Sequence, residues 1–286
     1  MIHPRPLLLA LLLGTTAGSA LASEPIRGAE GIGFYIGIDS LETLSSGTYA
    51  GLDNPNYGRL TLLFDHGNHF HSIGAYSLVG TADAPVVNGT NANNRIPELY
   101  ARIDPLPGAL TLTPGSGDFA GQLVSGVLDS SAAHHEYSYL GMSSIQTLAD
   151  AAPGSAQAVL YGSSSGRWSS ALDGVQVALK LEYITPGLKV AANGDADLFD
   201  ESNLFLLGAG NTFDFLPTFY TDAGSAPGTY SVQFSLVNLG SNLSVRDGGT
   251  FHYDFAVAAP VPEPGSWAML LGGLLMVGLT ASRRAR

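Results

Sequence analysis

The segment Val175-Gln-Val-Ala-Leu-Lys-Leu-Glu-Tyr183 alternates apolar and polar side chains along most of its length. Successive side chains of an extended chain point to opposite faces, so the apolar residues of this segment share one face. That face holds Val175, Val177, Leu179, Leu181 and Tyr183, and the other holds Gln176, Lys180 and Glu182. The pattern predicts a β-strand with one face buried against a core.

Two later segments follow the same rule, and each comes after a turn. The turn Ala226-Pro-Gly228 precedes a strand that is expected to bury Tyr230, Val232, Phe234 and Leu236. The turn Asp247-Gly-Gly249 precedes one that is expected to bury Phe251, Tyr253, Phe255 and Val257. Shorter strands, bounded by Gly, Pro, Asn or Asp, are predicted at 33–38, 59–65, 75–79, 109–113 and 158–161.

The spacing of these strands predicts an all-β fold, either an antiparallel β-sandwich or a two-lobed β-sandwich. Only residues 142–151 show a helical pattern, so we expect at most one short helix. Residues 82–98 and 162–174 are rich in Gly, Ser and Asn and are interpreted as long loops. A domain boundary within 165–174 is an alternative to a single β body.

The N-terminus has the three parts of a secretion signal. Arg5 precedes an apolar run over 7–13, and Ala20-Leu-Ala22 supplies small residues for cleavage. The run is too short to span a membrane, and it lacks the polar face of a helix that packs on a domain. Residues 1–22 are therefore interpreted as a signal peptide, which directs export through the inner membrane.

The C-terminus reads Val261-Pro-Glu-Pro264, then an apolar stretch over 267–281, then three arginines. This order resembles the PEP-CTERM sorting signal, with Pro262, Glu263 and Pro264 as the sorting motif. The resemblance covers 261–286 and implies a short transmembrane helix in the inner membrane and cleavage by an exosortase-type enzyme. It leaves 23–260 as an exported body that is periplasmic, on the cell surface or in the extracellular matrix. A permanent anchor of the same topology is the alternative.

The chain has 12 Lys and Arg against 24 Asp and Glu. Arg5, Arg283, Arg284 and Arg286 lie in the terminal segments, which leaves 8 against 24 and a net charge of −16 over 23–264. Such a surface repels phosphate backbones and attracts cations, so nucleic acid is not expected as a partner. The chain has no cysteine, so a metal site must use His, Asp and Glu.

The segment Asp65-His66-Gly-Asn-His69-Phe-His71 places three of the chain's seven histidines at the end of a predicted strand. In an extended chain His69 and His71 point to the same side. Gly67 allows a bend that brings in His66, and Asp65 can act as a ligand or a supporting partner. Three imidazoles at this spacing indicate a metal site, most simply for zinc. The alternative is a polar loop at a strand end.

Other residues are candidates for the rest of the shell. The sequence His134-His-Glu-Tyr137 offers His134, His135 and Glu136. Neighbours on a strand point opposite ways, so we expect at most one of these histidines, with Glu136, to join a site. His252 shares the outward face of the last predicted strand with Asp254, and it either completes the site or is solvated.

An acidic segment follows residue 192. Asn193, Asp195, Asp197 and Asp200 place oxygen donors close together, as calcium loops do. The EF-hand pattern fails, because Leu198 and Leu204 stand where it requires Gly and Glu. Calcium binding is one interpretation, and an acidic surface loop is the other.

Three common catalytic motifs are missing from the sequence. The sequence has no His-Glu-x-x-His motif, no phosphate loop and no dinucleotide-binding fingerprint. We therefore expect a protein without catalysis. A secreted glycoside hydrolase stays open as an alternative, because its paired carboxylates are recognised by their separation in space.

A second resemblance concerns the body. The runs His69-Phe-His-Ser-Ile-Gly-Ala-Tyr76, Asp195-Ala-Asp-Leu-Phe199 and Ala226-Pro-Gly-Thr-Tyr-Ser-Val232 resemble PEP-CTERM proteins whose genes are repressed by a zinc-uptake regulator. The resemblance implies an exported zinc-handling protein in which His69 and His71 are ligands. Some related proteins have a second His-x-His where this chain has Phe213-Asp-Phe215, so we expect no second site there.

Two functions follow from the sequence. The first is an exported, surface- or matrix-associated protein that binds zinc without catalysis. The second is a structural or adhesive protein of an exopolysaccharide matrix, which needs no metal site.

Overall fold

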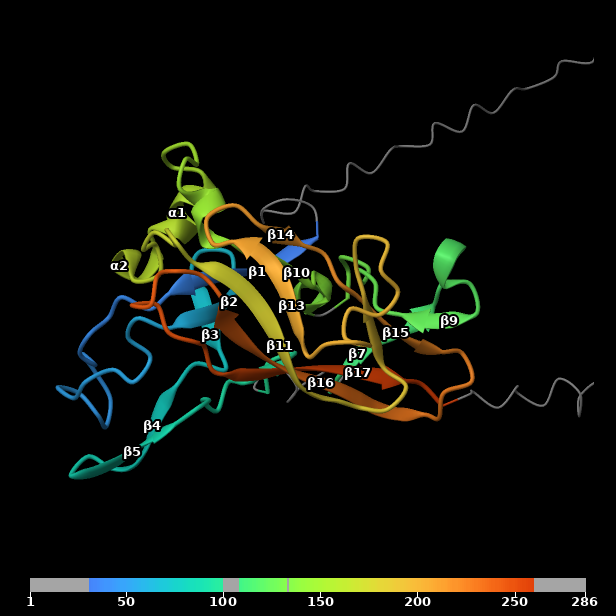
Figure 1. Ribbon diagram of the computed structural model, residues 1–286, viewed down its shortest axis with the longest axis horizontal. Helices are drawn as coiled ribbons and strands as arrows, with labels where there is room; N and C mark the ends of the chain where they lie inside the picture. The colour runs from blue at the N-terminus through green and yellow to red at the C-terminus, as the bar shows by residue number, and fades with distance from the viewer. Residues whose placement is uncertain (1–30, 100–107, 133, 260–286) are drawn as a thin grey trace, which may run out of the picture.

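The computed structural model describes residues 31–99, 108–132 and 134–259, and it confirms the expected all-β, sandwich-like architecture (Figure 1). A five-stranded sheet has the order β14 (Asp214–Phe215), β10 (Gly141–Ser144), β1 (Ile32–Ile38), β2 (Leu60–Asp65) and β3 (Phe70–Ile73). A six-stranded sheet has the order β13 (Leu204–Ala209), β11 (Gln176–Ile184), β16 (Gly228–Asn238), β17 (Thr250–Val257) and β6 (Arg95–Ile96), and β7 (Leu110–Thr111) also pairs with β17.

Two smaller sheets complete the strands. A four-stranded sheet has the order β12 (Lys189–Ala191), β15 (Thr218–Asp222), β9 (Gln122–Val124) and β8 (Thr113–Pro114). The hairpin of β4 (Ser77–Thr81) and β5 (Ala84–Asn88) projects from the body by itself (Figure 1). Most pairs are antiparallel, as expected, but β1 pairs with β10 in parallel, and β17 does so with both β6 and β7.

Aromatic side chains of β17 join the three larger sheets. The ring of Tyr253 packs against Phe34 of β1, with centroids 5.8 Å apart, and against Phe219 of β15 at 5.2 Å. Phe219 also lies 4.7 Å from Phe255. Buried residues on both sides of 165–174 belong to this same hydrophobic cluster. The sheets therefore share one core, and the histidine-bearing β2–β3 hairpin is built on its edge.

The strand predictions hold for the long alternating segments. In β16 and β17 the residues expected to face inward are buried, apart from the half-buried Tyr230. The prediction is wrong for Tyr183 of β11, which is 52% exposed. A β-bulge between Leu181 and Tyr183 shifts the register against β16, and an inserted residue reverses the face of every side chain beyond it.

The helix predictions are wrong in position. Residues 158–161, predicted as a strand, belong to helix α1 (Ala156–Tyr161), because the Ser155 hydroxyl caps the helix by accepting from the Ala158 N–H at 3.2 Å. A second short helix, α2 (Ser163–Gly166), follows it. Residues 142–151, predicted as a helix, form most of β10 and the 3₁₀ helix η4 (Ile145–Leu148), because pairing with β1 overrides the local pattern.

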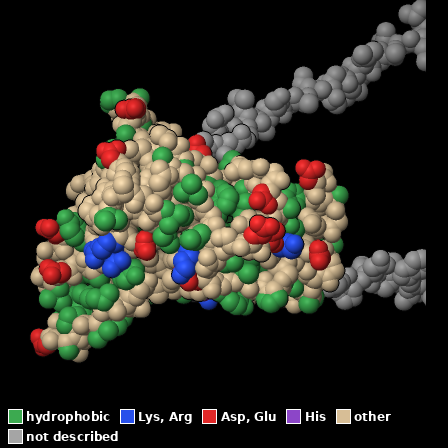
Figure 2. All heavy atoms as spheres, in the orientation of Figure 1, with side chains coloured by type: hydrophobic (Ala, Val, Ile, Leu, Met, Phe, Trp, Pro, Cys, Tyr) green, Lys and Arg blue, Asp and Glu red, His purple; other side chains and the backbone are tan. Residues whose placement is uncertain are grey.

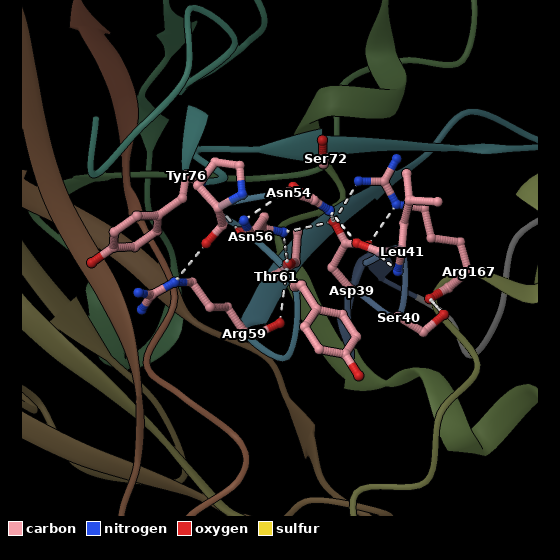
Figure 3. Close-up of polar contacts among 12 residues, drawn as sticks. Asp39, Ser40, Leu41, Asn54, Asn56, Arg59, Thr61, Ser72, Tyr76 and Arg167 are labelled. Carbon is pink, nitrogen blue, oxygen red and sulfur yellow. Dashed lines mark hydrogen bonds and ion pairs between the residues drawn. The ribbon is translucent and has the colours of Figure 1, made fainter. Parts of the chain in front are cut away.

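A buried polar network holds the long connection between β1 and β2 (Figure 3). Asp39 is fully buried, and its carboxylate accepts hydrogen bonds from the Leu41 N–H at 3.0 Å and from the side-chain amides of Asn54 and Asn56 at 2.9 and 3.1 Å. Arg167 donates to both of its oxygens, with Nε at 2.7 Å from Oδ1. This carboxylate therefore ties the connection and the residue after α2 to the end of β1.

Gly74 allows the chain to pass close to β17 after β3. Its φ is +65°, and an added Cβ would lie 2.3 Å from the carbonyl oxygen of Thr250. We expect Gly74→Ala to lower the free energy of unfolding by about 2–4 kcal/mol, because a left-handed conformation and a backbone clash add. Urea denaturation measures this change in the free energy of unfolding. Gly51 is the matched control, with φ +88° and no atom within 4 Å of the added Cβ; equal losses in both variants would contradict the clash.

No helix within the described residues is long and apolar enough to cross a membrane. The predicted signal peptide (1–22), the motif Pro262-Glu-Pro264 and the predicted C-terminal transmembrane helix lie outside the described residues.

Candidate metal centre

The turn between β2 and β3 folds the three clustered histidines together. Asp65 pairs with Phe70 at the end of the hairpin, and the His66 N–H donates to the His69 carbonyl at 3.0 Å. The Asp65 carboxylate accepts from the Gly67 N–H at 2.7 Å, and Gly67 has a φ of +88°. Glycine adopts this left-handed conformation without steric cost, so the turn brings His66 back over the strand that follows.

The three imidazoles converge. Each of His66, His69 and His71 offers one ring nitrogen, and these nitrogens lie within 4.8 Å of one another. Nε2 of His69 lies 3.0 Å from Nε2 of His71, and the rings of His66 and His71 are stacked with centroids 4.4 Å apart. His69 is exposed, and His66 and His71 are half-buried. The expected shared side of His69 and His71 is therefore present, with Phe70 buried on the other face.

A fully buried carboxylate, that of Glu98, binds one histidine of the cluster. Glu98, which follows β6, accepts from Nδ1 of His71 at 3.0 and 3.1 Å on its two oxygens. The Tyr137 hydroxyl donates to Glu98 at 2.7 Å, and the side-chain amide of Asn93 donates to its other oxygen. The Tyr137 ring is held in turn by stacking on Phe64 of β2, with centroids 4.5 Å apart. The orientation of His71 is therefore set by a packed hydrogen-bond network.

These contacts decide which ring nitrogens carry protons. A carboxylate oxygen only accepts, so Nδ1 carries the proton in the neutral form of His71, and Nε2 is the nitrogen that can bind a metal. Nδ1 of His69 faces the side-chain oxygen of Asn68 at 2.7 Å, which assigns the same tautomer to His69. Nε2 of His69 and Nε2 of His71 lie 3.0 Å apart, and when both rings are neutral these are the two nitrogens available to a cation bound between them.

The second histidine pair does not join this cluster. His134 has a φ of 56°, and residues His135–Ser138 form the 3₁₀ helix η3 rather than the strand assumed from the sequence. Nδ1 of His134 lies 3.2 Å from Glu136, and Nδ1 of His135 lies 3.2 Å from the Ala132 carbonyl. Within the described ranges, only His66, His69 and His71 form a group of three converging His, Asp or Glu side chains.

His252 is likewise not part of the converging group of three histidines. Burial lowers its pKa, and the nearby Arg95 lowers it further against the opposing charge of Asp254. Asp254, expected to face outward, is buried and accepts from Arg95 at 2.8 Å and from the Ser231 hydroxyl at 2.6 Å. The neutral form of His252 is therefore favoured beside an ion pair.

The acidic segment forms a tight turn. Ala192 and Asp195 exchange backbone hydrogen bonds of 3.1 and 2.8 Å around Asn193 and Gly194. Asp195 accepts from the Asp197 N–H, and the Asp197 carboxylate lies 3.6 Å from Lys189. No three Asp or Glu side chains within the described part of this segment, Asp200 included, converge as metal ligands do.

One serine motif is easily overlooked in the sequence. Gly162-Ser-Ser-Ser-Gly166 matches the Gly-x-Ser-x-Gly pattern of α/β-hydrolases. In those enzymes the serine sits on a turn between a strand and a helix. Here Ser164 lies in α2 directly after α1, exposed and with a φ of 53°, so the motif lacks the surroundings that give it catalytic meaning.

Sequence reasoning missed the residues that support the histidines. Glu98, Asn93 and Tyr137 lie 22 to 66 residues from His71, in segments read as loop or strand. The one available signal is Glu98 itself, an acidic residue that follows the Asn-rich run of residues 88–94. Neither the models of known protein families nor the curated proteins include a match to this chain.

Proposed function

We propose that this chain is an exported zinc-binding protein without catalysis, and that it holds one ion through His66, His69 and His71. The observation that carries the proposal is the convergence of three imidazole nitrogens within 4.8 Å beside a buried carboxylate that orients one of them. Metal-binding histidines commonly donate their second ring nitrogen to such a carboxylate.

The donor set favours zinc. Zinc takes histidine nitrogens at about 2.0–2.1 Å in tetrahedral sites, which corresponds to nitrogens about 3.3 Å apart. The 3.0 Å between the Nε2 atoms of His69 and His71 is close to this value. Three histidines leave a fourth position for water, and the exposure of His69 gives solvent access to it. An accessible site of this kind suits capture and release of an ion.

The charge of the protein suits the same role. Asp and Glu outnumber Lys and Arg on the face shown in Figure 2, in keeping with the composition of the chain. A negative surface raises the local concentration of divalent cations. Export would follow from the terminal signals, with processing by an exosortase-type enzyme and retention in the periplasm, at the cell surface or in the matrix.

The test is a calorimetric zinc titration of the protein purified without chelators. We expect one ion per chain, and loss of this binding in a variant carrying His66→Ala, His69→Ala and His71→Ala. Binding should weaken as pH falls, because protons compete for the imidazole nitrogens.

The matched control replaces three other histidines, His134, His135 and His252, with alanine. This variant should keep the stoichiometry and affinity of the unchanged protein, since its substitutions lie outside the cluster. Circular dichroism establishes that both variants are folded. Equal heats for the unchanged protein and the first variant would refute the proposal.

A further inference from the structure

A cavity of about 360 Å³ lies between the β9–β15 part of the four-stranded sheet and the turn around Asn193. Figure 1 shows β9 and β15 toward one end of the molecule, away from β2 and β3 and hence from the clustered histidines. Its walls come from the 3₁₀ helix η2 (Gly117–Phe119), from β9 and β15, and from residues 191–196. A volume of this size accommodates one or two sugar rings.

One side of the cavity is apolar. Phe119, Leu216 and Ala191 line it. The Phe119 ring is half-buried and is fixed edge-to-face against Tyr220, with centroids 5.3 Å apart. The Tyr220 hydroxyl donates to the Ala196 carbonyl at 2.6 Å, so Tyr220 braces the wall and the turn opposite. A rigid aromatic surface beside polar groups suits a ligand with one apolar face, such as the C–H face of a sugar ring.

The polar side is rich in hydrogen-bond acceptors. Asp118, Gln122 and Asp195 line it. The side-chain oxygen of Gln122 is buried and accepts no hydrogen bond within the described chain. Gln122 lines the cavity, and its side-chain amide can hydrogen-bond a ligand hydroxyl there once the side chain turns its oxygen toward the ligand. The complementary ligand is therefore one that donates several hydrogen bonds.

Charge narrows the ligand further. Asp118 and Asp195 place two carboxylates at the cavity, and none of its described lining residues is Lys or Arg. Carboxylates repel an anionic ligand and attract a cationic one. A uronic acid is thereby disfavoured, whereas a neutral hexose or a protonated amino sugar fits both the acceptors and the aromatic wall.

We propose that this cavity binds a neutral or amino sugar unit. The site is independent of the proposed zinc site, since the two share no residue. Sugar binding here would make the protein able to hold polysaccharide whether or not it holds a metal ion.

The test uses glucose, glucosamine and glucuronate, which share a ring and differ in charge. Saturation-transfer NMR on the purified protein should show binding of glucose and glucosamine. In competition experiments the affinity for glucuronate should be at least about 10-fold weaker. Phe119→Ala and Gln122→Ala should each weaken binding by about 10-fold, and Leu243→Ala, at a residue 87% exposed outside the cavity, should leave it unchanged.

A double variant with Asp118→Asn and Asp195→Asn tests the charge argument separately. It should narrow or reverse the preference for glucosamine over glucuronate. Adding a chelator should change none of these results. Sugar binding can therefore be tested independently of whether the protein binds zinc. No transfer to any of the three sugars, or binding that the Phe119 and Gln122 variants leave intact, would overturn the proposal.

Discussion

Replacing Glu98 with glutamine is expected to weaken zinc binding by about 10- to 100-fold, the usual effect of losing a carboxylate that supports a metal-binding histidine. The carboxylate accepts from His71 on both oxygens and holds the proton on Nδ1. A glutamine of similar shape can turn its amide N–H toward His71, which favours the other tautomer. Nε2 of His71 would then carry the proton and lose its lone pair for the metal.

Calorimetry of the Glu98→Gln variant measures this effect, and Glu136→Gln is the matched control. Glu136 bonds His134 rather than a member of the cluster, so its replacement should leave zinc affinity unchanged. The stability of both metal-free variants, measured by urea denaturation, separates a loss of orientation from a loss of folding. A Glu98→Gln variant that binds zinc as tightly as the unchanged protein would show that the carboxylate does not orient the ligand.

Replacing Asp39 with alanine is expected to lower the free energy of unfolding by about 3–5 kcal/mol, the cost of breaking a buried ion pair. The substitution leaves the amides of Asn54 and Asn56 without this acceptor, and Arg167 without its counter-ion. Urea denaturation measures the change. The control Asp83→Ala, at an exposed residue in the β4–β5 turn, should cost less than about 0.5 kcal/mol. Similar losses in both would contradict the role of the network.

The same carboxylate makes stability depend on pH. Burial by itself raises the pKa of Asp39, but hydrogen bonds and charge from Arg167, with hydrogen bonds from Asn54 and Leu41, outweigh burial and lower it. A folded-state pKa below the unfolded value of about 3.9 means that the unfolded chain binds the proton first. The contribution is complete above that value and is lost as pH falls through the folded pKa. The difference in the free energy of unfolding between the unchanged protein and the Asp39→Ala variant should therefore become smaller as the pH falls below the folded-state pKa of Asp39.

Local patterns were sufficient where one face of a strand meets the core. The alternation of apolar and polar residues located β11, β16 and β17 and identified the buried faces of the last two. Successive side chains of a strand point to opposite faces, so only one register places all the apolar side chains against the core. It failed at Tyr183, where a bulge decided by pairing with β16 reversed the faces. It also failed at 158–161, where a capping serine outside the segment favoured a helix.

The sequence by itself determined that this chain is an all-β protein and that His69 and His71 share a side, since both depend on neighbours a few residues apart. Only the tertiary structure determined that Glu98 accepts hydrogen bonds from His71, Asn93 and Tyr137. It also determined that the converging group does not include His134, His135 or His252. Those contacts join segments that only the packing of whole sheets brings together. The same pattern of buried and exposed residues is compatible with many arrangements of the strands. The spacing of residues along the chain therefore cannot predict these contacts.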